Sequence, residues 1–387
     1  MKYKIRDIAP MSTKSVNPQS EPNIFWHLYS LPSFDVGKRE EVLGKDIMSN
    51  KFVVPQRCIL FNKLNVRFKR VWRINSDEDH LIASTEFLPL VPNETIVDFN
   101  YLYQYLISDQ LTNFFNNQNS STSGSHKRID VDLFLDMEID LPALDFQRKV
   151  GKLVNLNDKI SLNTRINAEL EAMAKQLYDY WFVQFDFPDE NGRPYKSSGG
   201  KMVYNEKLKR EIPEGWYVSQ IENILDKVDS TPRLFTEEYL QEGKYPVIDQ
   251  TTDVYFIGFT NREDAVLNKY PVVVFGDHSC AVKYVNFPFV RGADGTQIML
   301  SNNSNISIEY LYFAVKNIRL NKGYARHYSF VKDSPIIIPT SNLANKYKNI
   351  ATNLFKQITQ RRFENKFLTH LRDSLLPMLM NGQVTVE

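Results

Sequence analysis

One short run, Asp277-His278-Ser279-Cys280, holds residue types that could form a catalytic centre. A carboxylate beside a histidine can orient the imidazole as a general base, and a hydroxyl or thiol could then act as the nucleophile. Adjacent residues of an extended chain point to opposite faces, which disfavours a dyad here. His278 could instead have a structural role in a turn or contact DNA. A hydrolase using Asp277 and His278 remains one alternative function for the chain.

The other short motifs do not indicate catalysis. Residues 197–202, Ser-Ser-Gly-Gly-Lys-Met, are similar to part of a phosphate-binding loop, but the first glycine is misplaced and Met202 replaces the hydroxyl that would hold magnesium. The Asn/Asp-Pro-Pro-aromatic motif of DNA amino-methyltransferases does not occur. Cys58 and Cys280 lie far apart, in no metal-ligand or redox spacing, which predicts a reduced, cytoplasmic protein without metal.

Basic residues are concentrated in residues 57–73. This stretch contains Arg57, Lys63, Arg67, Lys69, Arg70 and Arg73, interleaved with Phe61, Phe68 and Trp72. Lys and Arg neutralise DNA phosphates, although a solvated strand-and-loop face has the same composition. The whole chain, with 47 Lys plus Arg against 46 Asp plus Glu, has a net charge of only +1 and does not indicate binding by bulk electrostatics.

Polar and basic residues on expected loops are the candidates for DNA contact, because such side chains read base edges and hold phosphates. In the first half of the chain we select Lys63, Arg67, Lys69, Arg70, Ser84, Thr85, Ser125, Lys127 and Arg128. In the second half we select His278, Lys283, Arg291, Thr296, Gln297, Tyr324, Arg326 and His327. For each residue the alternative is a purely structural role in capping a strand or loop.

The elements that must position these residues form more than one core. The chain has 387 residues, of which 42% are hydrophobic and 13% aromatic, more than one ordinary domain holds. Aromatic and β-branched runs predict strands in residues 57–90 and 245–300. The apolar runs are only strand length, and the first ten residues lack the apolar segment of a signal peptide, so neither membrane insertion nor secretion is expected.

The two halves repeat the same parts in the same order. Tyr101-Leu102-Tyr103 returns as Tyr310-Leu311-Tyr312, and Ile139–Pro142 has a counterpart in Ile336–Pro339. A glycine-containing polar and basic loop lies between these landmarks in each half. The repeat predicts two related domains.

A helical pattern follows each repeat. The first apolar seam runs Leu153, Leu156, Ile160, Asn163, Asn167, Leu170, Ala174, Leu177 and Trp181. The second runs Tyr347, Ile350, Leu354, Gln357, Arg361, Glu364, Leu368, Leu371 and Leu375, and Pro377 with Asn381-Gly382 is expected to stop that helix. Both seams are polar at the centre, which predicts an antiparallel coiled-coil pair in which Asn163 and Asn167 meet Gln357, Arg361 or Glu364 and set the register.

Five segments carry a resemblance to a known family. They are Leu141–Gln147, Leu170–Ala174, Tyr180–Asp186, Pro194–Gly200 and Ile212–Trp216. They resemble the central conserved region of type I restriction-modification specificity subunits, and residues 371–377 with Met380-Asn381-Gly382 resemble the distal one. The likeness spans essentially the whole chain. Two departures exist: Asp145-Phe146 precedes Gln147 where the family commonly has acidic residues before the glutamine, and no equivalent glutamine follows Pro339 in the second half.

The resemblance implies an α+β, pseudo-two-fold subunit that is not an enzyme and that serves DNA methylation and phage defence. It places a first target recognition domain at residues 1–141, a central conserved helix at 142–186, a linker at 187–215, a second target recognition domain at 216–338 and a distal helix and tail at 339–387. Each domain would read half of a bipartite duplex site. Two methyltransferase subunits and translocating restriction subunits would be the partners, and they would carry S-adenosylmethionine, ATP and magnesium. The remaining alternative is a protein-interaction scaffold without a DNA role.

Overall fold

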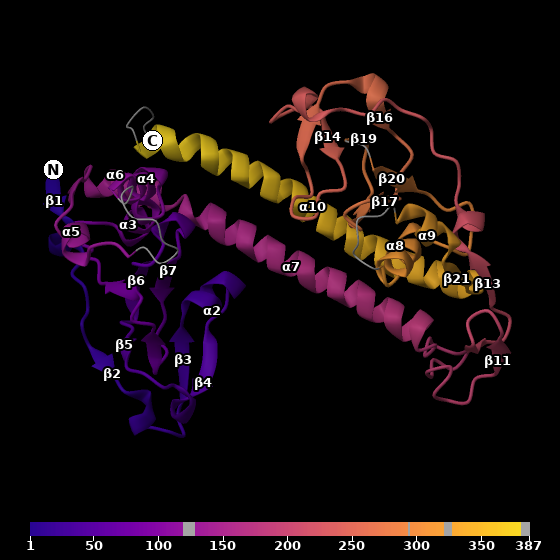
Figure 1. Ribbon diagram of the computed structural model, residues 1–387, viewed down its shortest axis with the longest axis horizontal. Helices are drawn as coiled ribbons and strands as arrows, with labels where there is room; N and C mark the ends of the chain where they lie inside the picture. The colour runs from indigo at the N-terminus through magenta and orange to yellow at the C-terminus, as the bar shows by residue number, and fades with distance from the viewer. Residues whose placement is uncertain (119–127, 293–294, 321–326, 381–387) are drawn as a thin grey trace. The chain divides into compact units, whose positions relative to one another are not determined.

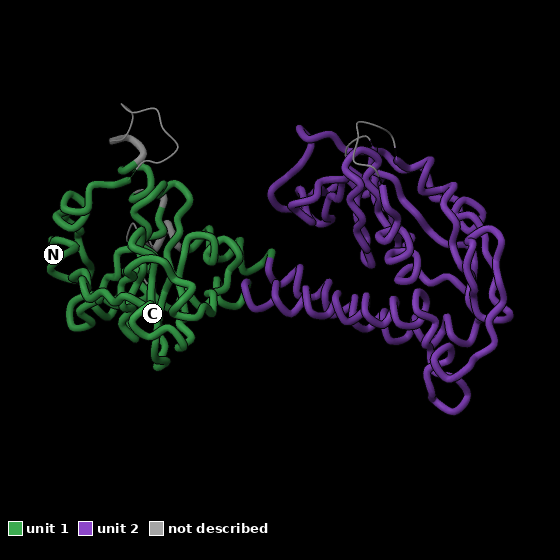
Figure 2. Tube along the Cα trace, turned by 60° about the horizontal axis from the view of Figure 1, so that its bottom comes forward, with its two compact units in different colours: residues 1–160, 366–387 green, residues 161–365 purple. Residues whose placement is uncertain are grey.

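The computed structural model describes residues 1–118, 128–292, 295–320 and 327–380. The chain forms two compact units (Figure 2). Unit 1 comprises Met1–Ile160 with Lys366–Glu387, and unit 2 comprises Ser161–Asn365. Within the described ranges, no helix is both long and apolar enough to cross a bilayer.

Unit 1 contains three sheets and several short helices (Figure 1). A five-stranded sheet has the order β2 (Ser15–Val16), β5 (Lys51–Val53), β8 (Leu81–Ala83), β3 (Phe25–Tyr29) and β4 (Glu40–Leu43). A three-stranded sheet has the order β7 (Val71–Asn75), β6 (Arg57–Asn62) and β9 (Phe87–Leu90), and β1 (Lys2–Lys4) pairs with β10 (Glu138–Asp140). The helices are α1 (Ile5–Ile8), α2 (Leu31–Val36), α3 (Phe99–Leu106), α4 (Asp109–Gln118), α5 (Val131–Leu135) and α6 (Leu144–Gly151).

Unit 2 contains the corresponding sheets. A four-stranded sheet has the order β15 (Gly258–Thr260), β14 (Tyr245–Ile248), β19 (Phe289–Arg291) and β16 (Val266–Leu267). A three-stranded sheet has the order β18 (Val282–Val285), β17 (Val272–Gly276) and β20 (Thr296–Met299), and β13 (Tyr217–Gln220) pairs with β21 (Pro335–Ile338). The short helices are α8 (Ile308–Lys316) and α9 (Tyr328–Asp333).

The strand pairing shows the internal repeat directly. β3 pairs with β4 in antiparallel and with β8 in parallel orientation, and β14 pairs with β15 and β19 in the same two ways. β6 lies between β7 and β9 as β17 lies between β18 and β20. The tyrosine pair expected to mark the repeat begins three residues after the N-cap in both helices, after Asp98 in α3 and Ser307 in α8. The content of helices and sheets is mixed, as the sequence predicted.

The central strand of each three-stranded sheet is buried on both faces. In β6, Ile59 and Phe61 enter one core cluster while Cys58 and Leu60 enter another. Likewise, Val273 and Phe275 of β17 enter a different cluster from Val272 and Val274. Because successive side chains of a strand alternate between faces, a continuous apolar run fits a strand between two cores. These rigid strands support the turns at their ends.

Two long helices contact each other along their sides within unit 2. In α7 (Val154–Tyr178), Asn163 donates from Nδ2 to Glu364 Oε2 at 2.8 Å, and Asn167 donates to the Ile358 carbonyl. Nearer the end of α7, the Ala174 carbonyl accepts from the Tyr347 hydroxyl of α10 (Ser341–Met380). The partners run down α10 as the residues run up α7, so the contact is antiparallel, and the expected meeting of Asn163 with Glu364 is present.

The seam expected on α10 is displaced by about one position in its first half. Ile350 is 45% exposed and Gln357 is exposed, so neither lies in the helix contact; the buried positions are Ala351, Phe355 and Ile358. Phe355 packs on Tyr284 and Tyr312 of unit 2. Packing against β18 and α8 therefore determines which face of α10 is buried. A pattern derived from the pairing of the two long helices alone does not include this packing.

The other expected seam residues of the helices are buried or half-buried. They are Leu153, Leu156, Ile160, Asn163, Asn167, Leu170 and Leu177 in the first pattern, and Leu354, Leu368, Leu371 and Leu375 in the second. α10 continues through Pro377 to Met380, and Asn381-Gly382, the other part of the expected stop, lies outside the described residues. The expected linker contains an antiparallel hairpin of β11 (Met202–Asn205) and β12 (Arg210–Pro213).

Candidate nucleic-acid interface

Three segments meet at one end of the three-stranded sheet of unit 1. The amide of Lys63 donates to the Glu86 carbonyl at 3.0 Å, and the Lys63 carbonyl accepts from the amide of Ile129 at 2.9 Å. Leu64 and Arg128 form an antiparallel bridge. We call this surface the unit 1 tip: residues 63–70 of the β6–β7 turn, residues 84–86, and Arg128.

The turn between β6 and β7 has a defined backbone. Asn65 and Lys69 adopt positive φ angles of 52° and 49° on either side of a 3₁₀ turn at Val66–Phe68. The left-handed region suits asparagine better than most other residues. The buried Asn62 side chain holds the start of the turn by accepting from the Leu64 amide at 2.8 Å, and Val66 is only 8% exposed. The tip is therefore anchored at its base.

Carboxylates orient two of the arginines at this tip. Arg70 binds Asp35 through two hydrogen bonds of 2.7 and 2.8 Å, and Arg128 binds Glu86 through two of 3.0 and 2.6 Å. The hydrogen bond from Arg128, with further help from the charges of Arg128 and Lys63, lowers the pKa of Glu86, which therefore stays ionised. Bidentate pairs of this kind fix a guanidinium plane. Sequence reasoning missed Asp35 and Glu86 as the partners of these arginines, because their pairing depends on the fold.

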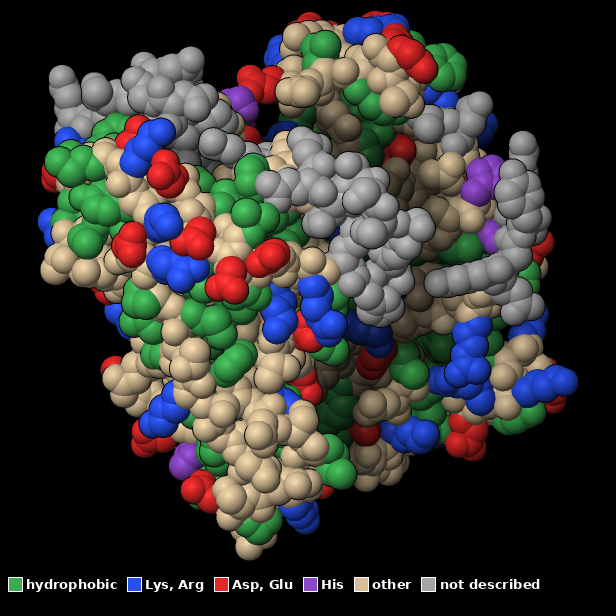
Figure 3. All heavy atoms as spheres, turned by 60° about the vertical axis from the view of Figure 1, so that its left-hand side comes forward, with side chains coloured by type: hydrophobic (Ala, Val, Ile, Leu, Met, Phe, Trp, Pro, Cys, Tyr) green, Lys and Arg blue, Asp and Glu red, His purple; other side chains and the backbone are tan. Residues whose placement is uncertain are grey.

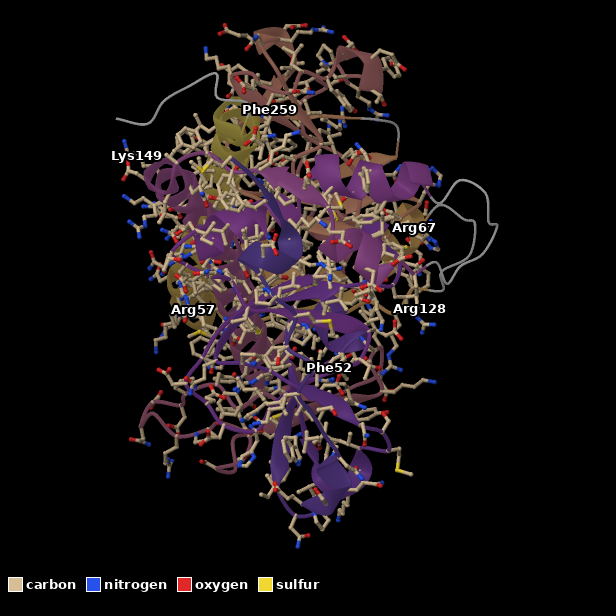
Figure 4. All side chains as sticks on the ribbon, turned by 90° about the vertical axis from the view of Figure 1, so that its left-hand side faces the viewer. Phe52, Arg57, Arg67, Arg128, Lys149 and Phe259 are labelled. Atoms are coloured by element: carbon tan, nitrogen blue, oxygen red, sulfur yellow. The ribbon has the colours of Figure 1, made fainter. Side chains whose placement is uncertain are left out.

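Seven of the nine residues selected in the first half gather at the unit 1 tip. They are Lys63, Arg67, Lys69, Arg70, Ser84, Thr85 and Arg128. Arg67 and Thr85 are exposed, while the Ser84 hydroxyl accepts from the amide of Glu86. Figure 4 shows Arg67 and Arg128 on the same side of unit 1, away from Arg57 and Lys149. Ser125 and Lys127 lie outside the described residues.

The remaining arginines of the basic stretch serve other contacts. Arg57, at the far end of β6, binds Glu94 and lies over the Phe99 ring. Arg73 pairs with Asp158 of α7. On the face shown in Figure 3, basic and acidic side chains are interspersed, so that face carries no broad field of one sign. The positive charge of the tip, five basic side chains with two carboxylates, is a local feature.

The equivalent end of the three-stranded sheet in unit 2 has a shorter turn. The Asp277 amide donates to the Gly295 carbonyl at 2.8 Å, and the Asp277 carbonyl accepts from the amide of His327 at 3.1 Å. We call this surface the unit 2 tip: residues 277–281, 295–296 and 327. His278 is exposed on it, and the His278 amide donates to the Gln250 side chain. Tyr324 and Arg326 lie outside the described residues.

Three of the residues selected in the second half are buried, although the selection expected them on exposed loops. Thr296 is 0% exposed and His327 is 7% exposed. Lys283, also 7% exposed, donates from Nζ to the Val254 carbonyl at 2.9 Å and lies 3.9 Å from Asp249. Burial lowers the pKa of Lys283 to about 8, although the Asp249 charge acts in the opposite direction. Lys283 on β18 and Thr296 on β20 point inward from their strands, and His327 is buried at the N-cap of α9. Their residue types do not reveal this.

Arg291 and Gln297 are intermediate cases. Both are half-buried, on β19 and β20 respectively. The Arg291 guanidinium donates to the Thr231 carbonyl at 3.3 Å, and desolvation followed by the charge of Arg233 lowers the pKa of Arg291. Among the selected residues of unit 2 that the structure describes, only His278 is exposed to solvent.

The run that could have formed a catalytic dyad has a structural role. The buried Asp277 carboxylate accepts from the amide of Tyr328 at 2.9 Å, at the start of α9. This places the carboxylate in helix capping. Among the described residues, no group of three or more His, Cys, Asp or Glu side chains could hold a metal ion.

The fold and the tips define a two-unit protein with an internal repeat, whose unit 1 presents a positively charged loop surface. The chain matches no model of a protein family. It is 25% identical to the type I restriction enzyme HindI specificity subunit of Haemophilus influenzae, over 88% of this chain and 93% of that protein. It is 23% identical to the MjaIX specificity subunit of Methanocaldococcus jannaschii, over 79% and 74%.

A solved structure supports the same fold. The type I restriction-modification S subunit from M. genitalium aligns with a TM-score of 0.58 and 16% identity, covering 98% of this chain and 95% of that one. The curated homologues of this chain are therefore type I restriction enzyme specificity subunits, and the resemblance inferred from the sequence is confirmed.

Proposed function

We propose that this chain is the DNA sequence-specificity subunit of a type I restriction-modification complex. The observation that carries the proposal is the unit 1 tip, where the fold brings together seven residues selected from separate parts of the sequence for DNA contact. The chain itself is not an enzyme: its homologues are specificity subunits, and the run at Asp277 serves a helix cap. It acts by binding and positioning DNA.

Residues 1–141 and 216–338 act as two target recognition domains, each of which binds one half of a bipartite duplex site. The matched sheets of the two units support this division of labour, since each three-stranded sheet presents a turn at the same end. The turns differ in length and in charge, so the two half-sites differ in sequence. Direct readout by side chains of these turns follows from their polar and basic composition.

Residues 142–186 and 339–387 form an antiparallel coiled-coil pair that separates the domains and docks two methyltransferase subunits. The support is the buried contact of Asn163 with Glu364, because a buried polar contact specifies helix register and orientation. S-adenosylmethionine, ATP and magnesium are bound by the methyltransferase and restriction partners, and the methyltransferases extrude the target adenines.

The test is to purify the chain together with the proteins encoded by its neighbouring genes and to map methylated adenines on DNA modified by the complex. The expected product is a two-part motif with an unread spacer. Exchange of residues 1–141 for those of a homologue should change one half of the motif, and exchange of residues 216–338 should change the other. Unmodified DNA and no methyltransferase in the purified complex would favour the scaffold alternative.

A further inference from the structure

One aromatic side chain stands exposed within the unit 1 tip. Phe68 ends the 3₁₀ turn and is 51% exposed, two residues after the buried Val66. Single exposed aromatic residues are common on protein surfaces and need no explanation by themselves. The contacts around Phe68 distinguish it from such residues.

The Phe68 ring is held between its neighbours before any ligand binds. The Arg70 guanidinium lies over the ring, 4.8 Å from its centre, and Asp35 fixes that guanidinium through two hydrogen bonds. The Arg67 guanidinium also lies over the ring, at 4.7 Å. The left-handed residues Asn65 and Lys69 close the turn on either side of Phe68. The ring is therefore both exposed and preorganised.

The two arginines differ in how firmly they are held. Arg70 has a bidentate carboxylate partner, and its side chain is 17% exposed. Arg67 is exposed, and its described contact is the Phe68 ring itself. An exposed cation–π contact is weak, because water competes for the cation. A DNA phosphate can therefore draw Arg67 from the ring while Asp35 keeps Arg70 in place.

We propose that Phe68 inserts as an apolar wedge at a base step of the first half-site, while Arg67 moves from the ring to an adjacent phosphate. An apolar side chain that unstacks a base step, next to cations that hold the backbone, is an established way for proteins to read and distort duplex DNA. The inference rests on the proposed function and adds a specificity-determining residue to it. Sequence preference would arise at that step from the cost of unstacking, without a hydrogen bond to a base edge.

The unit 2 tip gives the proposal a built-in comparison. The corresponding turn, residues 277–281, exposes His278 and contains no phenylalanine, tyrosine or tryptophan. Unstacking by an apolar wedge is thus predicted in the half-site bound by unit 1 and not in the half-site bound by unit 2.

The experiment uses the full chain purified with its methyltransferase partners and duplexes of the mapped motif. Each adenine position in turn is replaced by 2-aminopurine, whose fluorescence rises when the base is unstacked. Catalytic extrusion of the target adenine marks one known position per half-site, so that position is excluded. The wild type should raise the fluorescence at one further step of the first half-site, and Phe68→Ala should abolish this rise and weaken binding roughly tenfold. Phe68→Leu, which keeps an apolar wedge, should retain part of both effects.

The matched control is Phe25→Ala. Phe25 is 59% exposed in the same unit and begins β3, the strand whose other end, at Tyr29, accepts from the amide of Ser84 at the tip. This variant should behave as wild type. If the wild type does not bind the mapped duplex, the proposed function fails and the wedge fails with it. If the duplex binds and methylation proceeds, but no further step is unstacked or Phe68→Ala unstacks it equally, the wedge alone is wrong.

Discussion

The tips of units 1 and 2 lie at the ends of equivalent strands. They differ in how many of the polar residues selected for DNA contact are exposed to solvent. In unit 1, the selected cations lie on or near the surface, and two of them are oriented by Asp35 and Glu86. In unit 2, Lys283 of β18, two residues after the tip turn, points into the interior and binds a backbone carbonyl. The strands preserve the scaffold through their buried faces, while the turns are free to change length and charge. The difference shows how one repeated fold can present two distinct recognition surfaces.

The largest expected effect is on DNA binding by the unit 1 tip. Arg67→Glu reverses a charge at an exposed position and should weaken affinity for the mapped duplex by roughly tenfold or more, with a shallower dependence on salt. Electrophoretic mobility or anisotropy measurements over a salt series would show this. Lys149→Glu makes the same charge change on α6, on the side of unit 1 away from Arg67 (Figure 4), and should change the affinity of the chain without methyltransferase little. Equal losses in both variants would mean that the unit 1 tip is not the DNA surface.

The buried Lys283 gives the stability of unit 2 a pH dependence in the alkaline range. Its pKa is about 8 in the fold against 10.5 for the free side chain, so the unfolded chain binds more protons between these two values. The free energy of unfolding of the wild type should therefore rise with pH across this window, by about 1–3 kcal/mol relative to Lys283→Met. Asp249, Tyr255 and Arg362 face the amine or its neighbouring ring and are present in both proteins.

Urea unfolding at pH 7 and pH 10 measures this difference, and the comparison between the two proteins cancels the titration of other groups. Parallel pH profiles would contradict a buried amine. DNA affinity at pH 7 should agree within about twofold, because a side chain that is 7% exposed cannot reach phosphate. A large loss of affinity would restore Lys283 as a contact and remove the contrast between the tips.

A smaller effect is expected for the carboxylate that orients Arg128. Glu86→Gln should lower the free energy of unfolding by less than about 1 kcal/mol at pH 7, since the Arg128 side chain is 60% exposed and solvent screens the pair. The pKa of Glu86 is lowered in the fold. This contribution is therefore fully present above the ordinary glutamate pKa and is lost as the pH falls through the lowered folded value. Unfolding curves of the two proteins should converge once the pH falls below the folded-state pKa of Glu86; a constant difference would assign the effect to packing.

The smallest effect is expected at Thr296. Its hydroxyl is buried, and among the described residues it has no hydrogen-bond partner. Thr296→Val removes this hydroxyl at similar volume, so the free energy of unfolding should stay within about 0.5 kcal/mol or rise slightly. Affinity for the mapped duplex should not change, as fluorescence anisotropy would show. A clear loss of affinity would mean that Thr296 becomes exposed and contacts DNA in the complex.

Several features of the fold could be predicted because they depend on local pattern. The tyrosine landmarks and the Ile-x-x-Pro segments marked the repeat, and the strand-length apolar runs marked β6 and β17. Asn163 in the middle of an apolar stripe predicted a buried polar contact with the partner helix. The seam of α10 was predicted less well, since Phe355 and Ile358 pack against unit 2, a contact that no pattern within the helix reports.

The sequence by itself determined the repeat, the alternation of sheet and helix, and which turn is rich in cations, because these follow from the order and periodicity of residues. Only the tertiary structure decided which polar residues face solvent. Lys63, in the turn after β6, lies at a surface tip, whereas Lys283, in β18, is desolvated beside Asp249. Exposure depends on what packs against a side chain from distant parts of the chain, and the pairing of Arg70 with Asp35 likewise exists only once the strands are in place.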